Sequence, residues 1–401
     1  MTQPLDGIRV LEVGHFIAGP FAGMLLGDMG ADVIKIEQPG RGDQARATPP
    51  IINGESASFA VLNRNKRSIA LNLKHQAARN IVLSLAATSD VFLENNRPGS
   101  MKALGLGPDE IRAVNPDIVY VSASGFGQTG PYSRKAGVNL IVEAFAGTLS
   151  VTGSPDDMPM RPGIQTADIF GALFTTYAVL SGLISVLRDK GGRVADVSLA
   201  ESSIAAAAWE TAGYLATGEV PERIGHQHRL NCPYQLFETR DGVYMAIGTP
   251  NDELFAQLMR VLGLQGHLES PLFSSYALRK SNEKELLALI TPVVALRDSD
   301  DLIEKLESVG VPCSPVNDYK QVFSDPHIED RKVLVDVEHP RIGSTRLVRN
   351  PVLFDEHSPA IRRPAPMLGQ HSEEILRQLE YGEADIESLS REGTVFLGSP
   401  V

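Results

Sequence analysis

Cysteine is scarce in this chain, whose 401 residues include only Cys232 and Cys313. Two cysteines cannot build a disulfide framework, and so low a content is typical of proteins that fold in a reducing compartment. The N-terminus also lacks the basic segment followed by an apolar segment that marks a secretory signal peptide. We therefore expect a cytoplasmic protein.

Long uninterrupted apolar runs are also missing. The longest candidate, residues 169–187, contains two threonines, two serines and many small residues, which favours a packed helix over a membrane span. Basic residues are outnumbered, with 37 Lys and Arg against 49 Asp and Glu, so the net charge is −12. This charge argues against nucleic acid or an anionic membrane as partner, but a polyanionic small molecule needs only a local basic pocket.

Several familiar site motifs are absent. The turn at residues 14–19 (GHFIAG) has the wrong glycine spacing for the G-x-G-x-x-G motif of dinucleotide-binding proteins. Residues 122–127 (SASGFG) do not match the G-x-S-x-G motif of serine hydrolases, and no P-loop occurs. His226, His228 and Cys232 have no second ligand pair at a structural-site spacing, so no metal site is predicted.

Strands and helices alternate over the first 200 residues, which predicts an α/β fold with a parallel sheet. The expected strands are residues 8–13, 31–37, 68–73, 91–94, 118–122 and 193–198. The expected helices are residues 21–29, 76–88, 108–115, 139–149, 168–187 and 199–214.

The composition changes near residue 213 and again near residue 324. We predict the N-terminal part of a large α/β domain at 1–212 and a linker at 213–233. A smaller α+β domain is expected at 234–323, opening with a hairpin at 234–247 around Arg240-Asp241-Gly242. The chain then returns to the large domain at 324–401, with a charged helix at 372–380.

Asp168 is the most informative carboxylate, because it stands at the start of the long apolar helix. An aspartate there is favoured as an N-cap, since it accepts hydrogen bonds from the first free N–H groups. The same position can serve catalysis, because the helix dipole favours the ionised carboxylate and keeps it available as a nucleophile. Position alone leaves both interpretations open.

Basic residues gather in two places, at residues 64–67 (RNKR) with Lys74, and at Arg97 with Lys102. Either group could be an ordinary solvated surface. Both lie near the ends of predicted strands, however, and open α/β sheets bind ligands at the carboxyl ends of their strands. A nucleotide phosphate is the natural occupant that these side chains predict.

Seven segments along the chain together resemble the class III CoA-transferase family, of the CaiB/BaiF type, which also includes the α-methylacyl-CoA racemases. The segments are LDGIRVLEVGHFIAGP with ADVIKIEQPGRGD, LNRNKRSIALNLK, FLENNRPGSMKALGLG, ASGFGQTGPY, TADIFGAL with RVADVSLAES, GVPCSPVNDYKQVFSDPHIEDR and PAPMLGQHSEEIL. They span almost the whole chain in the family's order.

The resemblance implies a Rossmann-like large domain built from both chain ends, a smaller domain between them, and an interlinked homodimer. It implies that Asp168 attacks an acyl-CoA thioester and passes through aspartyl-anhydride and aspartyl-CoA intermediates. Coenzyme A and acyl-CoA are then substrates, with a free carboxylic acid as acceptor, and no permanently bound cofactor is expected. The implied CoA contacts are Ala18, Leu71, Asn72, Lys74, Asn95, Asn96, Arg97 and Lys102.

The racemase members of the family remain the alternative. They use a histidine for α-proton exchange, and Val138 stands at its position here, where an apolar side chain cannot move a proton. We therefore favour the transferase. The resemblance implies substrate contacts at Ile17, Asn139 and Gly248. Ile17 and the short loop at residues 247–251 differ from formyl-CoA transferases and favour a dicarboxylate acceptor such as succinate.

Overall fold

The computed structural model describes residues 3–398 of the chain, which divide into two compact units. The first unit comprises residues 1–148, 162–219 and 329–401, and the second comprises residues 149–161 and 220–328. The first unit is therefore built from both ends of the chain. Residues 149–161, which the sequence analysis assigned to the large domain, lie with the second unit.

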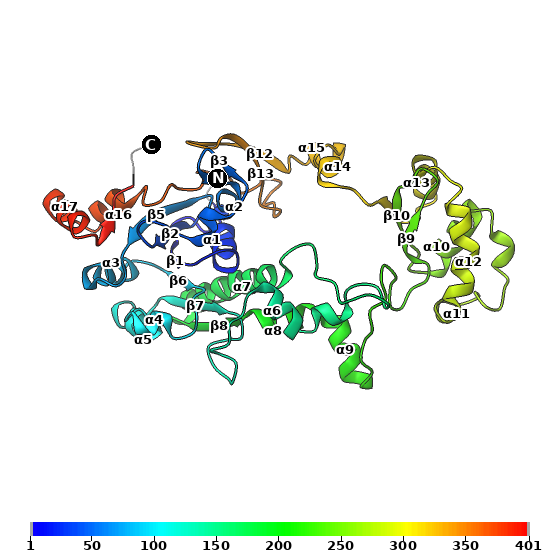
Figure 1. Cartoon of the computed structure of the whole chain (residues 1–401), viewed down its shortest axis with the longest axis horizontal. Helices are drawn as coiled ribbons and strands as arrows, with labels where there is room; N and C mark the ends of the chain where they lie inside the picture. Colours follow the sequence, from blue (N-terminus) through cyan, green and yellow to red (C-terminus); the bar gives the residue numbers. More distant parts are fainter. Residues whose placement is uncertain (1–2, 399–401) are drawn as a thin grey trace. The chain divides into compact units, whose positions relative to one another are not determined.

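A seven-stranded sheet forms the centre of the first unit (Figure 1). In spatial order its strands are β14 (Val395–Phe396), β5 (Lys66–Leu71), β2 (Asp32–Glu37), β1 (Arg9–Val13), β6 (Val91–Glu94), β7 (Val119–Ser124) and β8 (Val194–Ser198). All neighbours are parallel except β14, which pairs antiparallel with β5. The predicted α/β class with a mostly parallel sheet is confirmed.

Helices cover both faces of this sheet, because its strands carry apolar side chains on both sides. One face packs against α1 (Ala18–Asp28) and α7 (Thr166–Asp189). The other face packs against α3 (Gln76–Ala86), α5 (Pro108–Val114), α16 (Ser372–Gln378) and α17 (Glu383–Arg391). Helices α6 (Asn139–Phe145) and α8 (Leu199–Ala206) contact α7.

Shorter elements complete the first unit. They are β3 (Ile51–Ile52), β4 (Glu55–Ser56), α2 (Ala57–Leu62), α4 (Ser100–Ala103), α9 (Ala208–Thr217), β12 (Leu334–His339) and β13 (Gly343–Val348). By length and composition, α7 is the one helix within residues 3–398 that could cross a membrane. Core helices of soluble proteins meet the same test, and α7 packs against α1, α8 and β7.

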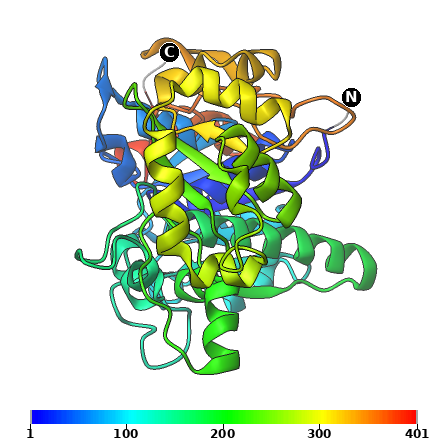
Figure 2. The same ribbon diagram turned by 90° about the vertical axis from the view of Figure 1, so that its right-hand side faces the viewer.

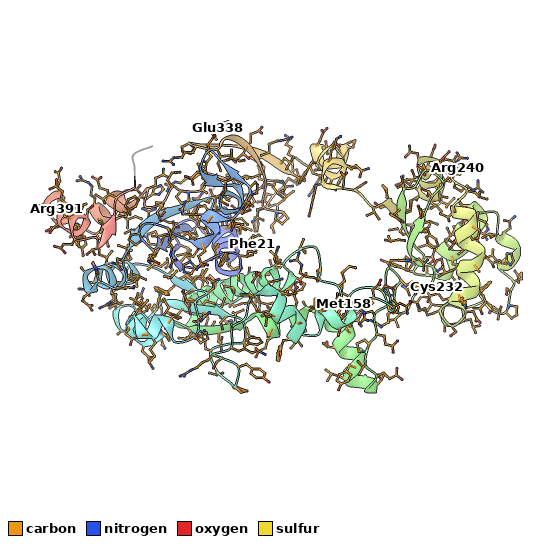
Figure 3. The ribbon with its side chains drawn as sticks, viewed as in Figure 1. Phe21, Met158, Cys232, Arg240, Glu338 and Arg391 are labelled. Carbon is orange, nitrogen blue, oxygen red and sulfur yellow. The ribbon has the colours of Figure 1, made fainter. Side chains whose placement is uncertain are left out.

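The second unit has its own apolar core. Three antiparallel strands, β9 (Tyr234–Glu238), β10 (Tyr244–Gly248) and β11 (Cys313–Pro315), form a small sheet that helices cover (Figure 2). The covering helices are α10 (Asp252–Val261), α12 (Glu283–Val294) and α13 (Ser299–Ser308), and α11 (Tyr276–Ser281) contacts α12. Helices α14 (Tyr319–Phe323) and α15 (Pro326–Asp330, which extends beyond residue 328) follow β11 and add no residue to this core. Cys232 is buried in this core, and Arg240 lies in the exposed turn of the hairpin (Figure 3).

Candidate functional site

The carboxyl ends of the central strands enclose a cavity of about 230 Å³. Strands β2 and β5 lie on one side of β1, and the later strands β6, β7 and β8 lie on its other side. Open α/β sheets bind ligands at such a switch point, which here falls between β1 and β6. The cavity is lined by residues that follow or end four neighbouring strands: Val13, His15, Ile36, Glu37, Gln38, Leu71, Asn72, Leu73, Lys74, Asn96, Met101 and Leu104. Four of the predicted CoA contacts, Leu71, Asn72, Lys74 and Asn96, are therefore brought together here.

Asn95 holds the loop between β1 and α1 instead of lining the cavity. Its side-chain oxygen accepts a hydrogen bond from the His15 N–H at 2.8 Å, and its amide group donates to the His15 carbonyl at 3.0 Å. A side chain at Gly19 would lie 2.8 Å from that oxygen, so glycine is required there. The Phe16 N–H donates to Asp43 at 3.1 Å while Phe16 has a φ of 58°. The loop is thus fixed from two sides.

A network of buried charges also holds this loop. Glu12 is fully buried; it accepts a hydrogen bond from Lys35 at 2.7 Å and forms an ion pair with Lys66 at 2.7 Å. Lys35 also contacts Asp43 at 2.9 Å and donates to the Gly14 carbonyl at 2.9 Å. Burial alone would raise the pKa of Glu12, but the two lysine charges overcome it and hold that pKa below its usual value. Burial lowers the pKa of Lys66 to about 8. This buried network ties β1 and β2 to the loop that follows β1.

Asp168 lies in the first turn of α7, two residues after the helix begins at Thr166. It is therefore not the N-cap, and the preceding residue, Gln165, makes no side-chain capping bond. Two side chains of α6 cap the helix instead. Glu143 accepts from the Thr166 N–H at 3.0 Å and the Thr166 hydroxyl at 2.6 Å, and Asn139 accepts from the N–H groups of Ala167 at 3.1 Å and Asp168 at 3.3 Å.

The residue before Asp168 packs in an apolar cluster. Ala18, Val142, Leu199 and Ala200 form a buried cluster with Ala167, which directly precedes Asp168. Ala18 begins α1 immediately after the loop that lines the cavity, so this loop runs from the cavity to the first turn of α7. The predicted residues Ile17 and Ala18 lie between these two places.

Burial raises the pKa of Asp168 to about 6, and the negative charge of Glu143 adds to the effect. The sequence analysis expected the helix dipole to keep this carboxylate readily ionised. The pKa lies above its ordinary value instead, because Asn139 and Glu143 already satisfy the first N–H groups and Glu143 contributes a negative charge, yet a carboxyl with a pKa near 6 is still mostly ionised at neutral pH. Within residues 3–398 no hydrogen bond reaches the Asp168 carboxylate oxygens.

The basic cluster at residues 64–67 does not line this cavity. Strand β5 begins at Lys66, two residues earlier than predicted, and residues 64–67 lie at its amino end, as they also do with the predicted bounds. Its charges are buried in ion pairs, Arg64 with Asp28, Lys66 with Glu12 and Arg67 with Asp32. Of that group only Lys74, at the opposite end of β5, lines the cavity.

The remaining predicted residues lie elsewhere. Arg97 and Lys102 are exposed and do not line the cavity. Gly248 ends β10 in the second unit. The stretch containing His226, His228 and Cys232 forms no group of three possible metal ligands, and none occurs anywhere within residues 3–398.

Two residues of the site were missed from the sequence. His15 lines the cavity, its Nδ1 is buried without a hydrogen-bond partner among the described residues, and burial lowers its pKa. Glu143 caps the helix that carries Asp168. Its position four residues after Asn139 on a predicted helix was a usable signal, because that spacing puts two side chains on one face.

Comparisons with known proteins agree with this arrangement. Residues 5–372 match CoA-transferase family III. The chain is 37% identical over 395 residues to the succinyl-CoA:glutarate CoA-transferase of Mus musculus, covering 98% of this chain and 90% of that protein. It is 35% identical over 384 residues to the succinate–glutarate CoA-transferase of Agrobacterium fabrum, covering 94% of this chain and 96% of that protein.

The fold has a solved counterpart in a CAIB/BAIF family protein from Brucella suis. The two superpose with a TM-score of 0.84 at 34% sequence identity, covering 94% of this chain and 100% of the other. Both the sequence and the structure therefore place the chain in one family. The chain belongs to CoA-transferase family III.

Proposed function

We propose that this enzyme transfers coenzyme A between carboxylic acids and that Asp168 is its nucleophile. The observation that carries the proposal is the position of Asp168: a half-buried carboxylate with no hydrogen-bond partner among the described residues, directly after the apolar cluster around Ala167 and next to the loop that leads from the cavity. A poorly solvated carboxylate is a strong nucleophile that has little water to shed before it attacks.

The transfer proceeds by exchange at two carbonyl groups and needs no net proton transfer. A carboxylate oxygen of Asp168 bonds to the thioester carbon, the C–S bond breaks, and CoA leaves as the thiolate with the electron pair. The thiolate then bonds to the Asp168 carboxyl carbon, and the donor acid leaves as its carboxylate. The acceptor carboxylate attacks this aspartyl-CoA thioester, and the same steps reverse to release the new acyl-CoA.

The cavity suits the nucleotide end of CoA. Lys74 at its rim supplies a positive charge for a phosphate, and Met101, Leu104 and Ile36 supply apolar surface for the base. The loop containing Ile17 and Ala18 would then guide the pantetheine arm toward Asp168. Arg97 and Lys102 would contribute only through changes in side-chain conformation, because neither lines the cavity.

Asn139 has an orientation that suits it to the acyl group. Its side-chain oxygen accepts from the N–H groups of Ala167 and Asp168, so its amide N–H groups point away from the helix terminus. These donors can hydrogen-bond the carbonyl oxygen that becomes negatively charged during attack. Asn139 is thus proposed as an acyl-binding residue, consistent with its sequence-based assignment.

For the acceptor we propose a dicarboxylate, with succinyl-CoA as donor. Support comes from the relatives named for succinyl-CoA with glutarate and for succinate with glutarate. The test incubates the purified enzyme with succinyl-CoA and each of a panel of acids, without ATP, and separates the products by chromatography. Formation of glutaryl-CoA or another new thioester supports the proposal. Absence of transfer, together with deuterium uptake at Cα of a 2-methylacyl-CoA, would support the racemase instead.

The rate of transfer is expected to fall as the pH drops through about 6. The folded enzyme holds the pKa of Asp168 near that value, and the protonated carboxyl is not a nucleophile. At pH 7 the group is mostly ionised and active, and below pH 6 the rate should fall about ten-fold per pH unit. The measurement is kcat/KM from pH 4.5 to 8, with protein fluorescence checking that the fold persists. A flat profile down to pH 4.5 would contradict the raised pKa.

We also propose a cytoplasmic homodimer. Helix α7 carries exposed apolar side chains spaced three or four residues apart along one face, at Leu173, Tyr177, Leu180, Ile184 and Leu187. A second copy of the chain is the partner implied by the family resemblance, and burial of this stripe would remove it from water. Light scattering of the purified enzyme tests this, and a monomeric mass would refute it.

A further inference from the structure

Glu143 is a fully buried carboxylate that the mechanism above does not use. One of its oxygens receives both hydrogen bonds from Thr166, at the start of the helix that carries Asp168. Its other oxygen, Oε2, is buried and has no hydrogen-bond partner among the described residues. Such an arrangement is unfavourable for the fold, since a glutamine at this position would cap the helix without introducing a buried charge.

No other charged group near α7 offsets the effect of the Glu143 charge on Asp168 among the described residues. The other acids in the elements around α7 are each engaged or exposed: Asp28 is paired with Arg64, Asp196 accepts from the Gln128 N–H, Glu94 accepts from the Asn96 N–H, and Glu201 is exposed. The loop before α6 carries Arg134 and Lys135, and Lys135 lies over the rings of Phe126, Tyr132 and Phe145. Glu143 is the one charge that raises the pKa of Asp168.

We propose that Glu143 is a positioning residue that both fixes the first turn of α7 and favours the covalent states of Asp168 over its free carboxylate. The proposal rests on Asp168 being the nucleophile. When an oxygen of Asp168 bonds to the acyl carbon and the C–S bond breaks, the aspartate loses its charge to the departing thiolate. In the aspartyl-CoA thioester the aspartate is likewise neutral. A nearby negative charge is repelled by the free carboxylate but not by these neutral forms.

The decisive variant is Glu143→Gln, which keeps an oxygen for Thr166 and removes the charge. The acidic limb, which is the part of the pH profile where kcat/KM falls as Asp168 becomes protonated, should then move to lower pH by about 0.5 pH unit or more. The fraction of enzyme carrying covalent CoA should fall about three- to ten-fold at fixed succinyl-CoA and succinate concentrations. The reason is that protonation and acylation both neutralise the Asp168 carboxylate, so a change in charge nearby affects both equilibria in the same direction. Intact-protein mass spectrometry measures this fraction, and peptide mapping locates the adduct.

Two further variants separate charge from structure. Thr166→Val removes the hydroxyl donor without changing charge, so it should lower thermal stability and leave the acidic limb at its wild-type pH. Asn139→Asp keeps the acceptor for Ala167 and Asp168 but adds a negative charge, so it should move the limb to higher pH. This last shift keeps the proposal testable even where Glu143→Gln folds poorly.

The outcomes distinguish the two proposals. If wild-type enzyme forms a CoA adduct on Asp168 but neither Glu143→Gln nor Asn139→Asp moves the acidic limb or changes the adduct fraction, the role of Glu143 is refuted and the nucleophile stands. If Thr166→Val shifts the limb as much as Glu143→Gln does, Glu143 acts through helix geometry alone and the charge argument is refuted. If the wild-type enzyme transfers CoA without any adduct on Asp168, the proposed nucleophile itself is wrong.

Discussion

An Asp168→Ala variant is expected to lose CoA transfer by on the order of 10³-fold or more, because it lacks the carboxylate proposed to form the anhydride and thioester intermediates. The substitution removes a partly buried side chain whose carboxylate oxygens bond to no described residue, so the fold should persist. The capping of α7 should also persist, since Asn139 and Glu143 bond to the backbone there and not to the Asp168 side chain. The measurement is the rate of glutaryl-CoA formation from succinyl-CoA.

The matched control for this variant is Asp189→Ala, at the other end of the same helix. Asp189 is exposed, so its loss should leave the transfer rate within about two-fold of wild type. Binding of free CoA, measured by calorimetry, should be retained in Asp168→Ala, because the cavity lining does not include Asp168. Near-wild-type transfer by Asp168→Ala would show that another group is the nucleophile. Loss of CoA binding together with transfer would indicate a structural role instead.

The central sheet could be predicted from sequence because each strand is a short apolar run between turn residues. Strand β6 was predicted with its observed bounds, Val91–Glu94, and the predicted helix at residues 168–187 differs from α7 by two residues at each end. Strand β14 was missed, since Val395–Phe396 is only two residues long and exists through its pairing with β5. Such an element has no local signal, because a distant partner determines it.

The candidate site was predictable only in part. Asp168 could be singled out because it stands at the start of a long apolar helix, and the family resemblance implied the contacts after β5 and β6. The charges could not be assigned, since Lys66 and Lys74 look alike in sequence. One is buried against Glu12, and the other lines the cavity at the opposite end of the same strand. Residues 64–67 lie at the amino end of β5 and Lys74 follows its carboxyl end, so only Lys74 of that group reaches this cavity.

Glu12→Gln is expected to destabilise the first unit by about 3–5 kcal/mol, the largest stability effect we predict. Glu12 is fully buried and contacts Lys35 and Lys66, so the amide would leave two buried ammonium groups with less compensation. There is also no room to relax, because a side chain at Gly23 of α1 would lie 1.9 Å from the second Glu12 oxygen. Thermal unfolding should show a decrease in Tm of about 6–10 °C.

Asp301→Asn supplies the surface control for Glu12→Gln. Asp301 pairs with Lys305 at 2.6 Å, but both side chains are half exposed, so its loss should cost less than about 0.5 kcal/mol. A double variant, Glu12→Gln with Lys66→Met, tests the cause further. If the penalty comes from an uncompensated buried charge, removing Lys66 as well should recover part of the stability that Glu12→Gln loses. An equal or greater loss in the double variant would show that packing, not charge, dominates.

The Glu12 network also links stability to substrate binding. Lys35 donates to Glu12 and to the Gly14 carbonyl and contacts Asp43, and Asp43 in turn holds the Phe16 N–H. A weaker network therefore loosens the loop that carries His15, Ile17 and Ala18. Glu12→Gln should accordingly raise KM for the acyl-CoA by more than Asp301→Asn does at a temperature where both variants are folded. An unchanged KM in a destabilised variant would mean that Asn95, with its two hydrogen bonds to His15, is sufficient to fix the loop.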